Sequence, residues 1–322
     1  MRKAILLAFL MAPICVEQAA ISAEPAANIS RVTTSFDFRY TEAVLKRVSR
    51  LLSSGLTVTG AGLLALLLLL AVAGPSVVPY DPTEQRPAER LQGPSLRHWA
   101  GTDRFGRDIL TRLAYGGRVS LGASGVALVL VMTIGLAVGM VAGYAGGAID
   151  ELAMRTVDAI LAFPSIVLGL VVAGLFGPGL WTVLLPLTAV SWASPARLTR
   201  GLVLQARESG SVEAARAVGA STTRILRREL LPVVLGPLVI LATVQLATLM
   251  LSLSALSFLG LGPQPPSPEW GAMLSDGRAH FMVAPHLMVF PGLMIFWSVL
   301  ALNLLGEGLR DLRDPRALAR VR

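Results

Sequence analysis

The residue types that most often carry catalysis or bind metals are few in this sequence and lie far apart. The single cysteine, Cys15, excludes an intramolecular disulfide and any multi-cysteine metal site. The three histidines, His98, His280 and His286, do not cluster along the chain. We expect the first two to be solvated loop residues, and the sequence predicts no metal site.

Catalytic and nucleotide-binding patterns are also missing. The apolar segments contain no acid pair and no serine–histidine set, so the sequence predicts that the chain is not an enzyme. The P-loop pattern Gly-x-x-x-x-Gly-Lys-(Ser/Thr) occurs nowhere in the 322 residues. We therefore predict no cofactor, and any ATP that drives this chain must be bound by a partner subunit.

The polar stretch most able to contact a partner is 207–232, which lies between two long apolar segments and is too charged for a bilayer interior. Hydroxyl residues flank Gly210 and form a turn, so we expect a helix to begin near Ser211. Glu213 falls in its first turn, where the helix dipole favours a negative charge. One surface of this helix is nearly smooth and permits close approach by a partner, because it carries Ala214, Ala215 and Ala217.

The same stretch predicts a second short helix. Gly219 can adopt the left-handed conformation that ends a helix, and Ser221 can cap the next one. Leu231 and Pro232 then mark the start of the following apolar segment. The local pattern is a helix, a glycine elbow and a second helix, which is also what an ordinary amphipathic hairpin between two membrane spans would show.

The composition places these elements in a membrane protein. The chain is 54% hydrophobic and 15% charged, which is typical of an integral membrane protein and not of a soluble one. Its net charge of +8 does not require nucleic acid as a partner. Arginines beside membrane spans explain it through anionic lipid and topology.

Six apolar blocks are long enough to cross a bilayer, which needs about 20 residues. The sequence therefore predicts an all-α integral membrane protein with six transmembrane helices, the third and fourth joined by Gly177-Pro178-Gly179. The expected spans are 56–79, 119–142, 154–176, 180–198, 233–259 and 286–306. The expected domains are a leader (1–55), the first transmembrane helix (56–79), an external loop (80–118), a five-helix core (119–306) that contains 207–232, and a tail (307–322).

The amino terminus looks like a secretory signal peptide, but the apolar run 4–16 is too short to span the membrane. We favour a cytoplasmic leader, followed by a basic amphipathic run at 37–52 that lies against the membrane surface. Most of the 28 lysines and arginines fall in segments on the same side as both termini and 207–232, which predicts that these are cytoplasmic. The arginine-rich segment 80–118 goes against this rule.

The helix–glycine–helix pattern resembles the EAA loop of ABC importer permeases, a coupling helix that docks into a groove on the ATPase subunit. Glu229 departs from that pattern, since the family often has isoleucine there. The residues that match at the family's spacing, and to which the resemblance gives the ATPase-coupling role, are Glu213, Ala214, Ala215, Gly219, Leu231 and Pro232.

A second string, residues 101–122, narrows the resemblance. Without any resemblance, the residues of this segment predict a solvated loop in which Asp103, Arg107 and Asp108 can pair locally. Its spacing is similar to the signature of the second, C-type permease of dipeptide, oligopeptide and nickel ABC importers, with Thr111 where serine is commoner. Further matching strings continue the resemblance over about residues 97–316.

The resemblance implies a type I ABC permease fold and half of a translocation pathway for di- or oligopeptides. It implies as partners a second homologous permease in a heterodimer, two ATP-binding cassette subunits and an extracytoplasmic substrate-binding protein, in a bacterial inner membrane. Besides these we expect membrane lipid and no nucleic acid as partners. Nickel or another small solute is an alternative substrate. An ATP-independent secondary transporter is disfavoured, since it would need coupling acids within the spans.

Asp158 is the one acid near a span interior, where a carboxylate is costly. Because Arg155 lies three residues before it and the span has just begun, we favour a structural role at the helix start over a gating role. Many relatives carry a glutamate where this chain has Leu253, so substrate inferences from that acid do not transfer.

Small residues and prolines predict how the helices meet. Gly135, Gly139 and Gly143 form a row that permits close approach of another helix, which indicates a helix–helix contact and not a binding site. Three prolines interrupt expected spans and could be hinges or fixed kinks, namely Pro164, Pro186 and Pro195.

Overall fold

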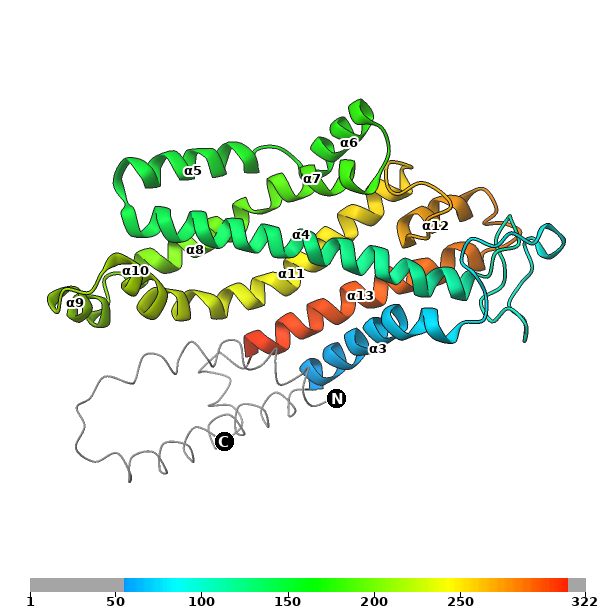
Figure 1. Cartoon of the computed structure of the whole chain (residues 1–322), viewed down its shortest axis with the longest axis horizontal. Helices are drawn as coiled ribbons and strands as arrows, with labels where there is room; N and C mark the ends of the chain where they lie inside the picture. The colour runs from blue at the N-terminus through cyan, green and yellow to red at the C-terminus, as the bar shows by residue number, and fades with distance from the viewer. Residues whose placement is uncertain (1–54, 312–322) are drawn as a thin grey trace, which may run out of the picture.

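The computed structural model describes residues 55–311, and within this range it contains helices and loops but no β-strand. The leader with Cys15, the run 37–52 and most of the tail lie outside the described residues. The long helices run side by side along the molecule (Figure 1). The elements are α3 (Gly55–Val77), α4 (Ile109–Ala145), α5 (Gly147–Leu161), α6 (Ser165–Phe176), α7 (Leu180–Ser191), α8 (Ala193–Ala206), α9 (Gly210–Ala217), α10 (Thr222–Ile225), α11 (Leu231–Phe258), α12 (Trp270–Arg278) and α13 (His286–Asp311).

The all-α fold is confirmed, but the six predicted spans are not six unbroken helices. Four unbroken helical stretches in the described range are long and apolar enough to cross a membrane: α3, α4, Thr222–Phe258 and α13. A fifth crossing is made if α5 and α6 count as one span, bent by 74°. The predicted fourth span corresponds to α7 and the beginning of α8, which are separate helices that flank Trp192.

Proline chemistry explains where the spans break. Pro164 stands between α5 and α6, and Pro195 lies in the first turn of α8. Proline has no N–H to donate and disfavours a helical conformation in the residue before it, so a helix stops or restarts there. Pro186, by contrast, lies within α7 without ending it. The turn at 177–179 joins α6 to α7 as predicted.

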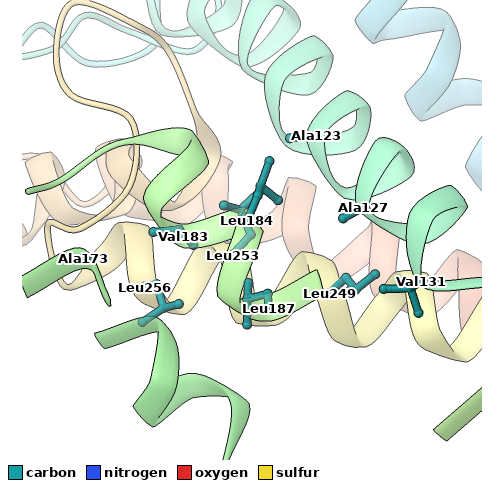
Figure 2. Close-up of a cluster of buried hydrophobic side chains, with 10 residues drawn as sticks. All are labelled: Ala123, Ala127, Val131, Ala173, Val183, Leu184, Leu187, Leu249, Leu253 and Leu256. Carbon is teal, nitrogen blue, oxygen red and sulfur yellow. The ribbon is translucent and has the colours of Figure 1, made fainter. Parts of the chain in front are cut away.

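The central core is apolar and draws on four helices (Figure 2). Three residues of α7 fill the space between α4 and α11, and α6 adds one alanine. Leu253 of α11 is fully buried in this cluster, so an acid at that position would lie among apolar side chains. The buried members are Ala123, Ala127, Val131, Ala173, Val183, Leu184, Leu187, Leu249, Leu253 and Leu256.

The glycine row on α4 packs against α8, which confirms the predicted helix–helix contact. A Cβ atom on Gly135 would lie 2.6 Å from Cβ of Pro195, and one on Gly139 would lie 2.5 Å from the carbonyl oxygen of Ala196. These distances are shorter than any van der Waals contact, so the two backbones approach each other only because the side chains are absent. The contact fixes the position of α8.

The segment before α4 is compact and several of its charged side chains, among them Asp103, Arg107 and Asp108, are buried, so the prediction of a solvated loop is wrong. Local pairing is confirmed: Arg107 donates to Asp103 at 2.5 Å, and both side chains are largely buried. Arg112 is 3% exposed and donates to the carbonyl oxygens of Pro82 and Pro266 at 2.9 and 3.3 Å. Because each buried charge has partners, the segment can close over this end of the bundle.

His98 is also buried, which corrects the prediction that it is solvated. The side chain is 1% exposed. Its Nδ1 lies 2.9 Å from a carboxylate oxygen of Asp108, and its Nε2 lies 3.3 Å from one of Glu89. Partners for both ring nitrogens make burial possible. Asp108 also caps α4 by accepting from the backbone N–H of Thr111, so the helix begins ten residues before the predicted span.

Helix α12 is held against α4 by one buried carboxylate. Glu269 accepts hydrogen bonds from the backbone N–H groups of Gly271 and Ala272 and from Oγ of Ser120. Burial raises the pKa of this carboxyl above its ordinary value. Next to it, Trp270 is fully buried and donates from Nε1 to the carbonyl oxygen of Leu113 at 2.9 Å. These bonds join the loop after α11 to the start of α4.

Asp158 does not support a helix start, so that prediction is wrong. It lies in the last turn of α5, because the helix begins at Gly147, before the predicted span. Its carboxylate forms an ion pair with Arg197 of α8. Arg155, the expected neighbour, pairs instead with Glu151 at 2.5 Å.

The glycine contact makes a testable prediction for stability. Gly139→Ala should lower the free energy of unfolding by about 1–3 kcal/mol, because its Cβ atom overlaps the backbone of α8. Gly125→Ala is the matched control, since it adds the same group to α4 where no atom lies within 4 Å. The measurement is the thermal unfolding midpoint of each permease in detergent. Equal midpoints for the two variants would contradict the close α4–α8 contact.

Candidate functional site

The stretch predicted to meet a partner forms a short helix at one end of the bundle (Figure 1). Helix α9 begins at Gly210, one residue before the predicted start, with Ser209 in the N-cap position. Glu213 lies in its first turn as predicted. Val212 is 1% exposed and packs with Ile225 into an apolar cluster beneath the helix. The helix is therefore anchored by its inner face and presents the opposite face to its surroundings.

The end of α9 follows the geometry that a glycine permits. Gly219 has φ of +74°, the left-handed region. Its N–H donates to the carbonyl oxygen of Arg216, and the next N–H, of Ala220, donates to that of Ala215, both at 2.9 Å. This pair of bonds is the Schellman arrangement, which satisfies the last carbonyl groups of a helix. The predicted elbow at Gly219 is confirmed.

The second helix of the stretch is continuous with a membrane span. From Ser221, in the N-cap position, the chain passes through α10 and a π-helical turn at 226–230 into α11. Pro232 lies in the first turn of α11 and interrupts nothing, since the wider π turn precedes it. Glu229, at the position where the family often has isoleucine, lies half-buried in that turn. Helix α11 thus extends rigidly to the elbow.

The six residues assigned to ATPase coupling fall into two groups. Glu213, Ala214 and Gly219 are exposed on α9 and its end, and Ala215 is half-buried on the inner face. Leu231 and Pro232 are half-buried at the start of α11, and Leu231 packs against the apolar cluster below α9. Glu213, Ala214 and Gly219 can touch a partner directly. Ala215, Leu231 and Pro232 support the position of α9.

The exposed surface around α9 combines apolar and basic groups. Val218, next to the elbow, is 83% exposed. Four arginines near it in the sequence are also exposed and form what we call the basic rim, namely Arg216, Arg224, Arg227 and Arg228. An exposed apolar side chain next to a basic rim is suited to binding in a pocket on another protein. The described residues contain no group of three or more histidine, cysteine, aspartate or glutamate side chains that could hold a metal ion.

Three arginine contacts hold this end of the bundle together, and sequence reasoning missed them. Arg207, at the end of α8, donates to the carbonyl oxygen of Gly143 at 3.1 Å, and Arg216 of α9 lies over the ring of Tyr144. Arg200 of α8 forms a bidentate pair with Asp150 of α5 at 2.5 and 2.6 Å. The partners are about 50 or more residues apart in sequence, so no local pattern could reveal them. These contacts connect α9 to the end of α4, and α8 to α4 and α5.

Two protein-family models match the chain. Residues 135–318 match the model described as a binding-protein-dependent transport system inner membrane component. Residues 46–94 match the model described as the N-terminal TM domain of oligopeptide transport permease C. The first match spans more than half of the chain and contains α9 and the helices that support it.

Curated relatives match over most of their length. The chain is 41% identical to the dipeptide transport system permease protein DppC of Alkalihalophilus pseudofirmus over 261 residues, which cover 81% of this chain and 86% of the relative. It is 42% identical to the glutathione transport system permease protein GsiD of Pectobacterium atrosepticum over 258 residues, or 80% and 86% of the two chains.

Among solved structures, the chain is similar to the methionine ABC transporter MetNI in an inward-facing conformation. The TM-score is 0.50 at 22% sequence identity, and the match covers 64% of this chain and 98% of that one. This likeness supports the type I ABC permease fold. Taken with the family matches and the relatives, it shows that the chain belongs to the family of binding-protein-dependent transport system inner membrane components, as a C-type permease of an ABC importer.

Proposed function

We propose that this permease forms half of a translocation pathway and that α9 couples it to a separate ATPase. The observation that carries the proposal is the exposed face of α9 at the end of the bundle, with Val218 projecting beside the Gly219 elbow. The helix is anchored from below by Val212, and the chain beyond the elbow is helical from Thr222 to Phe258. Movement of a partner bound to α9 would therefore be transmitted to a complete membrane span.

The energy that such coupling needs is modest. Moving a two-state population from 1:99 to 99:1 takes about 5.5 kcal/mol of differential binding. ATP-driven closure of the partner supplies this if the closed ATPase binds one state of the permease pair more tightly. The chain has no P-loop, so the nucleotide belongs to the partner.

The partners follow from this arrangement. We propose a second homologous permease as a heterodimer partner, two ATP-binding cassette subunits of which one contacts α9, and a substrate-binding protein on the opposite side of the membrane. The placement is a bacterial inner membrane with α9 and both termini cytoplasmic. The basic rim of α9 supports this side, because arginine-rich segments are retained in the cytoplasm.

The proposed substrates are short peptides with free termini. The support is that the two relatives named above are permease proteins of a dipeptide transport system and of a glutathione transport system. Both of these solutes contain amide bonds and carry an ammonium group and carboxylates. The permease handles such solutes after a binding protein delivers them.

The elbow provides the sharpest test of coupling. Gly219→Val should abolish uptake while leaving the protein in the membrane, because a β-branched residue is strained at positive φ and would tilt α9. Gly210→Val is the control, since it adds the same side chain to an exposed glycine of α9 that has no positive φ and no neighbour within 4 Å. Uptake of labelled peptide by the complete transporter is measured. Normal uptake by the Gly219 variant would show that the coupling assignment is wrong.

The charge of α9 makes a second prediction. Glu213→Lys places a cation in the first turn of α9, where the helix dipole disfavours it by about 0.3–1 kcal/mol, and reverses the charge at this position of the proposed docking face. We expect weaker co-purification of the ATPase subunits and reduced uptake. Glu208→Lys, an equal charge change at an exposed position before the helix, should leave both nearly unchanged. Equal loss in the two variants would point to net charge and not to the docking face.

Substrate class is tested on the complete transporter with its binding protein. Unlabelled dipeptide should compete with uptake of a labelled dipeptide, and glutathione should compete in proportion to its affinity for the binding protein. A nickel chelate should not reduce the uptake of the labelled dipeptide. Competition by the chelate alone would replace the peptide proposal with the metal alternative.

A further inference from the structure

The broken span places charged residues inside the membrane. Helix α6 has 12 residues and is bent by 74° from α5, so it covers at most roughly 18 Å of depth at about 1.5 Å per residue. The hydrocarbon core is about 30 Å thick. The turn after α6 bonds to the loop after α11, at the end of the bundle opposite α9 (Figure 1). The last turns of α5 must therefore cross part of the remaining hydrocarbon core, and these turns contain Asp158.

The same argument applies to α8. Helix α7 also has 12 residues, so the crossing that it begins must be completed by the first turns of α8, which contain Arg197. Below the two charged residues, Val157, Ala193 and Ala196 are fully buried where α5 meets α8. The ion pair between Asp158 and Arg197 therefore lies on the outer side of this contact, at membrane depth.

The pair is exposed and incompletely bonded. Its carboxylate is 66% exposed and its guanidinium side chain 52%. Within residues 55–311, neither side chain makes a hydrogen bond other than the one that joins them. A carboxylate can accept several hydrogen bonds and a guanidinium can donate five, so most of their capacity needs water or another polar group. Lipid offers neither, and charges in hydrocarbon are costly.

The chain break next to the pair gives an independent indication. Residues 162–164, between α5 and α6, are all exposed, and Phe163 is 67% exposed. Backbone that leaves the helix at membrane depth is tolerated where protein buries it or where it lines a water-filled cavity, and not against lipid. Asp158 and the break lie within a few residues of each other on one bent span, and Arg197 reaches Asp158 from α8.

We propose that the Asp158–Arg197 pair and the adjacent break at 162–164 line the water-filled translocation path of the assembled importer. The open hydrogen-bonding capacity of the pair favours water over a dry protein interface, where each unsatisfied group would be costly. The inference rests on the transport function and not on the coupling role of α9. Its test therefore uses labelling and needs no active ATPase.

The experiment compares three single cysteines in the assembled importer in native membranes, with Cys15 replaced by serine. Asp158→Cys probes the proposed path, and Arg197→Cys repeats the probe if the first variant does not assemble. Leu66→Cys is the lipid control, since Leu66 is the middle residue of α3 and is 62% exposed in the chain. Leu96→Cys is the bulk-water control, since Leu96 is 99% exposed before α4.

A small charged thiol reagent reacts with thiolates, which form in water and not in lipid. The reagent should label the path cysteine of the Asp158→Cys variant at a rate near that of the Leu96→Cys variant. It should label the Leu66→Cys variant roughly 100-fold more slowly. The same reagent carried on a bulky polymer should label only the Leu96 variant, because a path is narrow. Labelling of the path cysteine as slow as that of the Leu66 variant would overturn the proposal. So would fast labelling by the bulky reagent, which would place the pair in bulk water.

Discussion

The close contact between α4 and α8 is the constraint on which both functional regions depend. Gly135, Gly139 and Gly143 bring the two backbones together, and a Cβ atom at any of them would overlap α8. Since apolar side chains gain little by leaving lipid for protein, such close packing is a main source of stability between membrane helices. It sets the direction of α8, which carries Arg197 in its middle and leads to α9 at its end.

From this contact the bundle divides its tasks by position. At one end, α9 rests on an apolar cluster, and Arg207 and Arg216 hold this end to α4, an arrangement that suits the docking role we propose. Near the breaks in α5–α6 and α7–α8, Asp158 and Arg197 form the pair that we propose lines the path. The far end is closed by the segment before α4, whose buried charges have partners within the segment and on α12. The polar groups therefore lie at the two ends and near the helix breaks, with apolar helical stretches between them.

The buried charges at the far end show how a polar segment becomes part of a membrane protein's core. His98 lies between two carboxylates, and Arg112 donates to two backbone carbonyl groups from different loops. A buried charge that lost its partner would cost several kcal/mol, so these bonds hold the loops in one arrangement. Glu269 has the same function for α12, with donors from its own helix and from Ser120.

The sequence by itself determined the features that depend on neighbouring residues. The turn before α9, the position of Glu213, the elbow at Gly219 and the close-packing row on α4 all follow from residue type and spacing, and the structure has them where they were predicted. Only the tertiary structure decided the contacts between distant residues. The pairs Asp150–Arg200 and Asp158–Arg197 join residues that lie 50 and 39 positions apart in the sequence. Local propensity carries no information on such partners, because burial and exposure are set by which helices the fold brings together.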